Sequence, residues 1–265
     1  MVDFKNKTIW ITGASSGIGK ALAISLSEED TNLILSSRNE EGLNKVKELC
    51  KQPEMVKVLP LDLEEHSSFD DKVNEALNLF DGVDILINNG GLSQRSLTAE
   101  TGLKVDKQLF DVNYFGTIGL TKALLPHFIT KESGQIVVVS SVMGKFGTPL
   151  RSAYAASKHA LHGFFDSLRA ELFNKNIKVT IICPGYVNTQ ISKNALSADG
   201  SKHNQMDNAT ANGLSPEVFA QKALKAIAKQ KQEVVIGGFK ETSAAYLKRF
   251  FPNILSKVIR KVNVT

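Results

Sequence analysis

The chain has 265 residues, 42% hydrophobic and 22% charged, which is enough for a globular domain with a sizeable core. Its two isolated cysteines and five histidines show no metal-ligand spacing, so we expect a reducing compartment and no metal site. The net charge of +5 lies wholly in residues 240–265, which hold six basic residues and one acidic residue. The rest of the chain is therefore neutral, which argues against nucleic-acid binding.

The start of the chain shows no targeting signal. Residues 1–13 enter an apolar strand almost at once, without the charged and apolar regions of a signal peptide. No stretch approaches the roughly 18 uninterrupted apolar residues of a membrane span. The sequence therefore predicts a cytoplasmic protein.

Short β-branched runs alternate with helical patterns along the chain. The expected strands are residues 7–12, 32–37, 55–61, 83–88, 134–141, 177–183 and 233–237. The expected helices are residues 17–29, 39–51, 66–80, 103–131, 152–174 and 215–230. Several strands are apolar nearly throughout, as in a sheet that is covered on both faces. This alternation, without an internal boundary or repeat, predicts one domain with a doubly wound parallel sheet.

A glycine-rich turn, ITGASSGIGKALA, follows the first expected strand and opens the first expected helix. Gly13, Gly17 and Gly19 allow a tight turn and a close approach of the backbone to a pyrophosphate, which would lie at the helix N-terminus. A plain turn is the alternative, but the strand–turn–helix context favours a nucleotide site.

The segment LSSRNEEGL begins at the end of the second expected strand. At this position the side chains of a dinucleotide site distinguish NAD from NADP. Ser37 and Arg38 stand where an NAD site usually has an acidic residue, and the first acids, Glu40 and Glu41, fall in the next helix. Arg38 is either a solvated loop arginine or a ligand of the 2′-phosphate through charge-assisted hydrogen bonds. We expect the second role, so NADP(H) is favoured over NAD(H).

Tyr154 and Lys158 lie four residues apart in SAYAASKHAL, so they share one face of an expected helix. Alone, the pair is either packing beside a solvated charge or a proton donor beside the cation that adjusts its pKa. Together with the spacing G-x-x-x-G-x-G, the motif Y-x-x-x-K resembles the short-chain dehydrogenase/reductase family, and the resemblance covers almost the whole chain.

The resemblance implies a single-domain Rossmann fold over residues 1–265, with a doubly wound, seven-stranded parallel sheet in the order 3-2-1-4-5-6-7 and helices on both faces. It also implies a cofactor site that draws on LPLDLEE, INNGG and CPGYVNT. INNGG places Gly90 where the family has alanine. With the turn and the second strand, the expected cofactor-binding residues are Gly13, Ser15, Ser16, Gly17, Ile18, Gly19, Ser37, Arg38, Asp62, Leu63, Asn89, Gly90, Gly91, Tyr154, Lys158, Pro184, Gly185, Val187 and Thr189.

By the same resemblance, four residues carry the chemistry: Asn113, Ser141, Tyr154 and Lys158. Tyr154 would be the general acid or base, because Lys158 and an oxidised nicotinamide favour its phenolate and lower its pKa. Ser141 would hydrogen-bond the substrate oxygen, and it is preferred to Ser140 because it lies 13 residues before Tyr154, the family spacing. Asn113 would hold a water of the proton relay, and the cofactor carries the hydride.

These residues predict an oxidoreductase that interconverts a carbonyl and an alcohol with NADP(H). INNGGLSQRSL and SAYAASKHALHGFFDSLRAEL resemble the dehydrogenase/reductase member 7 group and its bacterial relatives, which implies a lipophilic ketone or aldehyde as substrate. A homodimer or homotetramer is also expected by resemblance. The alternative is an NADP(H)-binding regulator or sensor with little turnover, although such members usually lose the Tyr, Lys or Ser that this sequence keeps.

Two segments lie outside the regular alternation of strands and helices. Residues 189–214 follow the sixth expected strand and are expected to form a substrate lid. Residues 240–265 form a basic tail in which Pro252 can open a second helix. The apolar positions of the tail at helical spacing are Leu247, Phe251, Ile254, Leu255 and Val258. The tail either packs on the body or on another subunit, or it contacts an anionic membrane or covers the substrate.

Overall fold

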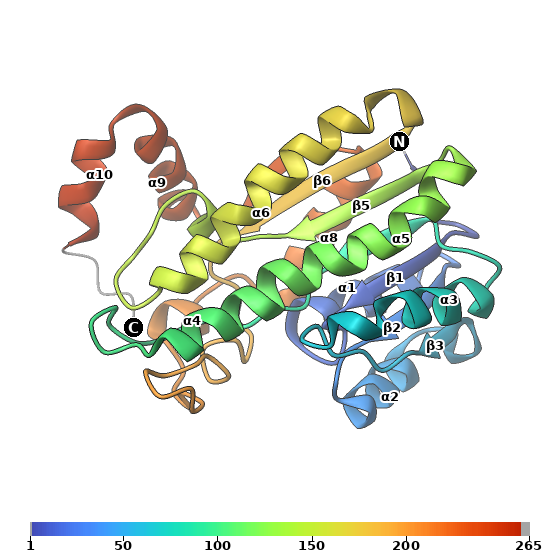
Figure 1. Cartoon of the computed structure of the whole chain (residues 1–265), viewed down its shortest axis with the longest axis horizontal. Helices are drawn as coiled ribbons and strands as arrows, with labels where there is room; N and C mark the ends of the chain where they lie inside the picture. Colours follow the sequence, from blue (N-terminus) through green and yellow to red (C-terminus); the bar gives the residue numbers. More distant parts are fainter. Residues whose placement is uncertain (1, 261–265) are drawn as a thin grey trace.

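The computed structural model of the protein describes residues 2–260, and its centre is one parallel sheet (Figure 1). The strands follow the order β3-β2-β1-β4-β5-β6-β7, which confirms the predicted fold class and strand order. Their bounds are β1 (Thr8–Thr12), β2 (Asn32–Ser36), β3 (Val56–Val58), β4 (Ile85–Asn88), β5 (Gly134–Val139), β6 (Ile177–Pro184) and β7 (Glu233–Ile236). The third strand is shorter than predicted, although Leu59 and Leu61 still donate backbone hydrogen bonds to the chain at and just after β2.

Helices cover both faces of the sheet (Figure 1). The helices α1 (Gly17–Ser27), α2 (Glu40–Leu49) and α8 (Pro216–Ala228) contribute to one hydrophobic core. The helices α3 (Phe69–Leu79), α5 (Thr117–Lys131) and α6 (Ser152–Glu171) contribute to the other. Short 3₁₀ turns lie at Pro53–Met55, His66–Ser68, Val142–Gly144 and Phe173–Lys175.

Strand β1 supplies side chains to both cores. Ile9 and Ile11 pack in the core beside α1, whereas Trp10 between them packs in the core beside α5, as the alternation of a strand requires. Trp10 is the single tryptophan of the chain and is fully buried. Its Nε1 donates a hydrogen bond of 2.8 Å to Ser36 Oγ, which ties β1 to the end of β2.

The helix predicted over residues 103–131 is continuous but not uniform. It begins as α4 (Leu103–Phe110), widens into a π-helical segment (Asp111–Gly116) and continues as α5. Such segments frequently occur at functional sites, because the wider turn changes the direction in which side chains point. Asn113 lies within this segment and is fully buried.

The C-terminal part adds a short helix and a helical hairpin. Residues 189–214, the predicted lid, contain α7 (Asn208–Ala211), and single bridges join Leu196 to Gln94 and Leu214 to Val187. The helices α9 (Phe239–Phe250) and α10 (Pro252–Ile259) form a hairpin at one end of the molecule, and Pro252 opens α10 as predicted (Figure 1). The last part of the predicted tail, residues 261–265, lies outside the described residues. Within residues 2–260, no helix combines the length and the apolar character needed to cross a membrane.

Candidate active site

An open cleft of about 680 Å³ runs along the carboxyl ends of the central strands. This is the edge of an open α/β sheet at which ligands bind. All the predicted cofactor and catalytic residues line the cleft except Gly19 and Asn113. Those two contact residues that do line it, Gly13 and Leu92 respectively. The predicted residues therefore converge on one site.

The glycine turn is shaped by its backbone. Gly13 and Gly17 have φ values of +64° and +54°, in the left-handed region that favours glycine. A Cβ at Gly19 would lie 2.3 Å from the Gly13 carbonyl oxygen, so a larger residue there would push the helix away from the turn. Just after β4, Asn89 Nδ2 donates to the carbonyl oxygens of Thr12 (3.0 Å) and Gly13 (3.2 Å). Asn89 thus holds the start of the turn, and the first turn of α1 packs closely against it at Gly19.

At the end of β2, Arg38 lies beside two carboxylates. Its guanidinium is 3.9 Å from Asp62 Oδ2 and 3.6 Å from Glu64 Oε2, and its side chain is 56% exposed. Asn39 Oδ1 accepts a hydrogen bond from the backbone N–H of Gly42 and so caps α2. The start of α2 therefore fixes the backbone next to Arg38, while the half-exposed guanidinium is held by these two long ion pairs.

Gly90 stands where the family has alanine, and its surroundings explain the difference. A Cβ at this position would lie 2.6 Å from Leu63 Cδ1, so the Leu63 side chain occupies the space that the alanine of the family would need. The backbone N–H groups of Asn89 and Gly90 both donate to Thr12 Oγ1 at 3.0 Å. The Leu63 side chain therefore fills the space of the missing methyl group, and the end of β4 stays hydrogen-bonded to β1.

The chemical end of the cleft is formed by α6 and the end of β5. Tyr154 and Lys158 are both buried, and Lys158 Nζ lies 5.9 Å from the centre of the Tyr154 ring. Lys158 Nζ donates a hydrogen bond of 3.0 Å to the carbonyl oxygen of Val139. Ser141 follows β5, and its Oγ accepts a hydrogen bond of 3.1 Å from the backbone N–H of Met143. This bond leaves the Ser141 hydroxyl free to donate.

Burial is the largest influence on the pKa values of Tyr154 and Lys158. It lowers the pKa of Lys158 from 10.5 to about 8. It also raises the pKa of Tyr154, against the opposing influence of the Ser141 hydroxyl and of the cations Arg95 and Arg151. We expected Lys158 and an oxidised nicotinamide to lower the pKa of Tyr154. In the protein alone the desolvation of the phenol is the larger effect, so the direction is the opposite.

The side chain of Asn113 forms hydrogen bonds with groups of the protein itself. Its Oδ1 accepts a hydrogen bond of 2.7 Å from the backbone N–H of Leu92, and its Nδ2 donates to the carbonyl oxygen of Leu92 (2.9 Å) and to Ser157 Oγ (3.1 Å). The π-helical segment thereby fixes the loop after β4 against α6. That Asn113 holds a water of a proton relay stays a prediction.

Gln94 is a positioning residue that the sequence analysis missed. It is fully buried, and its Oε1 accepts hydrogen bonds from the backbone N–H groups of Ala153 (2.9 Å) and Tyr154 (3.3 Å). These groups belong to the first turn of α6, which has no partner for them within the helix. Gln94 therefore caps the helix that carries Tyr154. The sequence held no local signal for this role, because the cap and the helix are separated by 59 residues.

A buried ion pair joins the predicted lid to the same loop. Arg95 Nε lies 3.0 Å and 3.1 Å from the two carboxylate oxygens of Asp207, which also accepts hydrogen bonds from Arg151 and Thr210. Burial pushes the pKa of Asp207 upward, but Arg95 and Arg151 outweigh it and hold the pKa below its usual value. Residues 189–214 are thus fixed beside Tyr154 by a charged pair inside the protein.

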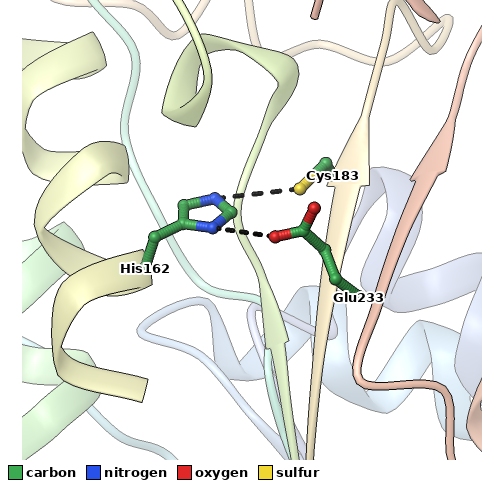
Figure 2. A group of neighbouring side chains, drawn as sticks. All are labelled: His162, Cys183 and Glu233. Atoms are coloured by element: carbon green, nitrogen blue, oxygen red, sulfur yellow. Dashed lines mark hydrogen bonds and ion pairs between the residues drawn. The ribbon is translucent and has the colours of Figure 1, made fainter. Parts of the chain in front are cut away.

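A second polar group lies where α6 meets β6 and β7 (Figure 2). His162 faces Cys183 Sγ with Nε2 (3.8 Å) and Glu233 Oε2 with Nδ1 (3.3 Å). Nε2 is also 3.0 Å from Ser140 Oγ, and the Lys145 ammonium contacts both Nδ1 and Glu233. Since the two ring nitrogens face different partners and Lys145 already supplies a cation, the group is a hydrogen-bonded network rather than one set of metal ligands.

The pKa values of this network support a structural role. The hydrogen bond with His162 is the largest influence that lowers the pKa of Glu233 to about 2, and Lys145 acts in the same direction against burial. Burial raises the pKa of Cys183 to about 12, so the thiol stays protonated and is a poor nucleophile. The network therefore ties α6 to the edge strand β7.

Comparison with known proteins defines the class to which this site belongs. A family profile described as short chain dehydrogenase matches residues 7–200. Dehydrogenase/reductase SDR family member 7B of Xenopus tropicalis is 44% identical over 260 residues, which cover 94% of this chain and 83% of that protein. The chain therefore belongs to the short-chain dehydrogenase/reductase family of oxidoreductases, and the predicted resemblance to the member 7 group is confirmed.

Two solved structures share the fold. A short chain dehydrogenase/reductase of Burkholderia phymatum in complex with NAD has a TM-score of 0.84 and 22% identity, covering 100% of this chain and 98% of that chain. A short chain dehydrogenase of Burkholderia cenocepacia in complex with NADP has a TM-score of 0.79 and 21% identity, covering 97% and 99%. At these identities the likeness concerns the fold.

Proposed function

We propose that the protein is an NADP(H)-dependent oxidoreductase that interconverts a lipophilic ketone or aldehyde and its alcohol, with Tyr154 as the general acid or base. One observation carries the proposal: Ser141, Tyr154 and Lys158 line the same cleft as the glycine turn. A bound nicotinamide cofactor would supply or accept the hydride. The protein must then bind the cofactor, orient the substrate and move one proton.

The glycine turn fits a dinucleotide. Ser16, Gly17 and Ile18 line the cleft, so the N-terminus of α1, with the positive end of its dipole, faces the space where a pyrophosphate would lie. A Cβ at Gly17 would lie 3.2 Å from the Thr189 side chain, so the turn leaves little space for a side chain of its own. Backbone N–H groups are therefore the groups that this end of the cleft offers to an anion.

The chemical end fits proton transfer. In the reductive direction, Tyr154 donates its phenolic proton to the substrate oxygen while the Ser141 hydroxyl hydrogen-bonds the same oxygen. The raised pKa of Tyr154 keeps the phenol protonated at neutral pH, as a donor requires. Lys158, whose pKa is lowered to about 8, can exchange protons near neutral pH and so can restore the proton of Tyr154. In the oxidative direction the same groups act in reverse.

Arg38 supports NADP(H) as the cofactor. It lines the cleft next to Ser37, and its exposed guanidinium can turn from Asp62 and Glu64 to a 2′-phosphate. We expect wild type to have the higher kcat/KM with NADPH, and we expect Arg38→Ala to reduce the NADPH-to-NADH preference by about tenfold or more, since a charge-assisted fork is lost. Steady-state kinetics with both cofactors measures this, and a wild type that prefers NADH contradicts the assignment.

Apolar residues of the cleft support a lipophilic substrate. Their side chains come from the loop after β4, from the π-helical segment and from the predicted lid: Leu92, Val112, Ile191 and Leu196. A screen of NADPH consumption over aldehydes, ketones, steroids and retinoids tests the proposal. We expect turnover of at least one apolar carbonyl compound. NADPH binding without consumption of any member of the panel would favour the sensor alternative.

A further inference from the structure

The C-terminal hairpin, residues 239–260, has an inner side that packs on the catalytic end of the molecule. Leu255 of α10 is buried in one cluster with Tyr154, Met143 and Phe146, and Leu247 of α9 packs against that cluster. The hairpin is therefore fixed beside the catalytic tyrosine rather than free in solvent. Packing on the body, which the sequence left as one option for the tail, is what this inner side shows.

The outer side of the hairpin exposes large apolar side chains. On α9 these are Phe239, Tyr246 and Phe250, which are spaced by seven and four residues and so form one stripe. On α10 a second stripe begins at the preceding Phe251, and its further members are Ile254 and Val258. All six are between 46% and 88% exposed.

The two stripes meet at the turn of the hairpin, because Phe250 ends α9 and Phe251 directly precedes α10. Single exposed apolar residues are normal on a protein surface, whereas a grouped set on one element marks an interaction surface.

The charges of the hairpin are positive with one exception. Its described basic residues are Lys240, Lys248, Arg249, Lys257 and Arg260, and its one acidic residue is Glu241. Among residues 2–260, none of these five cations forms an ion pair. The apolar stripes therefore lie on an element whose positive charge is not neutralised by the protein.

We propose that this hairpin docks the protein on an anionic lipid surface. Aromatic and aliphatic side chains that enter the acyl boundary, together with lysine and arginine, are the features of interfacial helices that bind such membranes. A second copy is the less favoured occupant, because a twofold contact would place two surfaces of the same positive charge against each other. Nucleic acid would match the charge but offers no apolar layer for the stripes.

The docking has a consequence for the cleft. Since the inner side of the hairpin packs in the cluster that contains Tyr154, a docked hairpin holds the catalytic end near the lipid. Lipophilic substrates dissolved in the bilayer would then have a short path to the cleft. This delivery rests on the proposed function, whereas the docking itself does not.

Vesicle co-sedimentation of the full chain tests the docking. We expect binding to vesicles of phosphatidylcholine with about 30% phosphatidylserine at about 0.1 M salt, and at least tenfold weaker binding to phosphatidylcholine alone or at about 0.5 M salt. A double variant, Tyr246→Ser with Phe250→Ser, and a charge reversal, Lys248→Glu with Arg249→Glu, should each weaken binding at least tenfold.

Matched controls lie elsewhere on the surface. Phe173→Ser removes a phenylalanine that is 81% exposed in the 3₁₀ turn after α6, and Lys225→Glu with Lys229→Glu reverses two exposed lysines on and just after α8. Both should bind vesicles as wild type does, and thermal unfolding should show that all variants are folded.

Two results would overturn the proposal. One is failure of wild type to bind the anionic vesicles. The other is a change of oligomeric state, measured by sedimentation velocity, in the Tyr246→Ser and Phe250→Ser variant, since the face would then be covered by a second copy. Vesicle binding needs no turnover, so a protein that binds vesicles without reducing any carbonyl refutes the proposed function alone.

Discussion

The two ends of the cleft are built in opposite ways. The nucleotide end depends on residues without a side chain, since Gly13, Gly17 and Gly19 let the backbone itself form the site. The chemical end depends on buried polar side chains, since Gln94 caps α6 and Arg95 binds Asp207, which lies 112 residues away. The comparison shows that an anion site can be encoded locally, whereas the position of the Tyr154 phenol needs partners from distant parts of the chain.

The largest effect should come from the phenol itself. Tyr154→Phe removes the proposed proton donor but keeps the ring, so we expect kcat to fall about 10²- to 10⁴-fold, the usual contribution of a general acid or base. NADPH binding, measured by titration, should stay as in wild type because the nucleotide end is untouched. Retention of most of the reductase activity would refute the role of Tyr154.

The pH dependence of stability should reveal the buried lysine. The pKa of Lys158 is about 8 in the folded protein and about 10.5 when exposed, so between these values the unfolded chain binds the extra proton. The stability of wild type relative to Lys158→Met should therefore rise with pH through this window, by at most about 3 kcal/mol. Urea unfolding of both proteins without cofactor at the two ends of the window measures it, and a relative stability that falls with pH would contradict the burial.

The cap from Gln94 should affect both stability and rate. Gln94→Leu leaves the backbone N–H groups of Ala153 and Tyr154 buried without their acceptor, which should lower the free energy of unfolding by about 2 kcal/mol. Because Tyr154 then loses its fixed position, we expect kcat to fall more than KM rises. Gln94→Glu retains the acceptor and should recover most of kcat. Equal kcat values for the two variants would indicate a merely structural role.

The smallest effect should be confined to the nucleotide end. Gly19→Ala forces the turn apart, since its Cβ would lie 2.3 Å from the Gly13 carbonyl oxygen, and we expect the KM for NADPH to rise about tenfold with kcat nearly unchanged. Gly147→Ala is the matched control, because its Cβ would meet nothing within 4 Å. A Gly19→Ala variant that loses kcat instead would show that the two ends are coupled.

The same difference explains what the sequence could predict. The glycine turn and the Tyr154–Lys158 pair follow from motifs whose spacing is local, and the strand order follows from the family resemblance that these motifs carry. Gln94 and the Arg95–Asp207 pair could not be predicted, because nothing near either residue signals a partner that only the fold brings close. The π-helical segment was missed because one extra residue in a single turn leaves no motif or composition signal of its own within residues 103–131. The composition of the tail was visible, but which side of each helix stays exposed depends on the body.

Trp10 gives the molecule a built-in optical probe of the central sheet and of one of its two cores. The single indole lies fully buried in β1, immediately before the glycine turn, and its hydrogen bond to Ser36 reaches the end of β2. Its emission should therefore respond when the end of β2 loosens, or when the core that Trp10 shares with α3, α5 and α6 does, and stay nearly silent when the hairpin does. Unfolding curves from tryptophan fluorescence and from far-UV circular dichroism that coincide would mean that both halves melt as one cooperative unit.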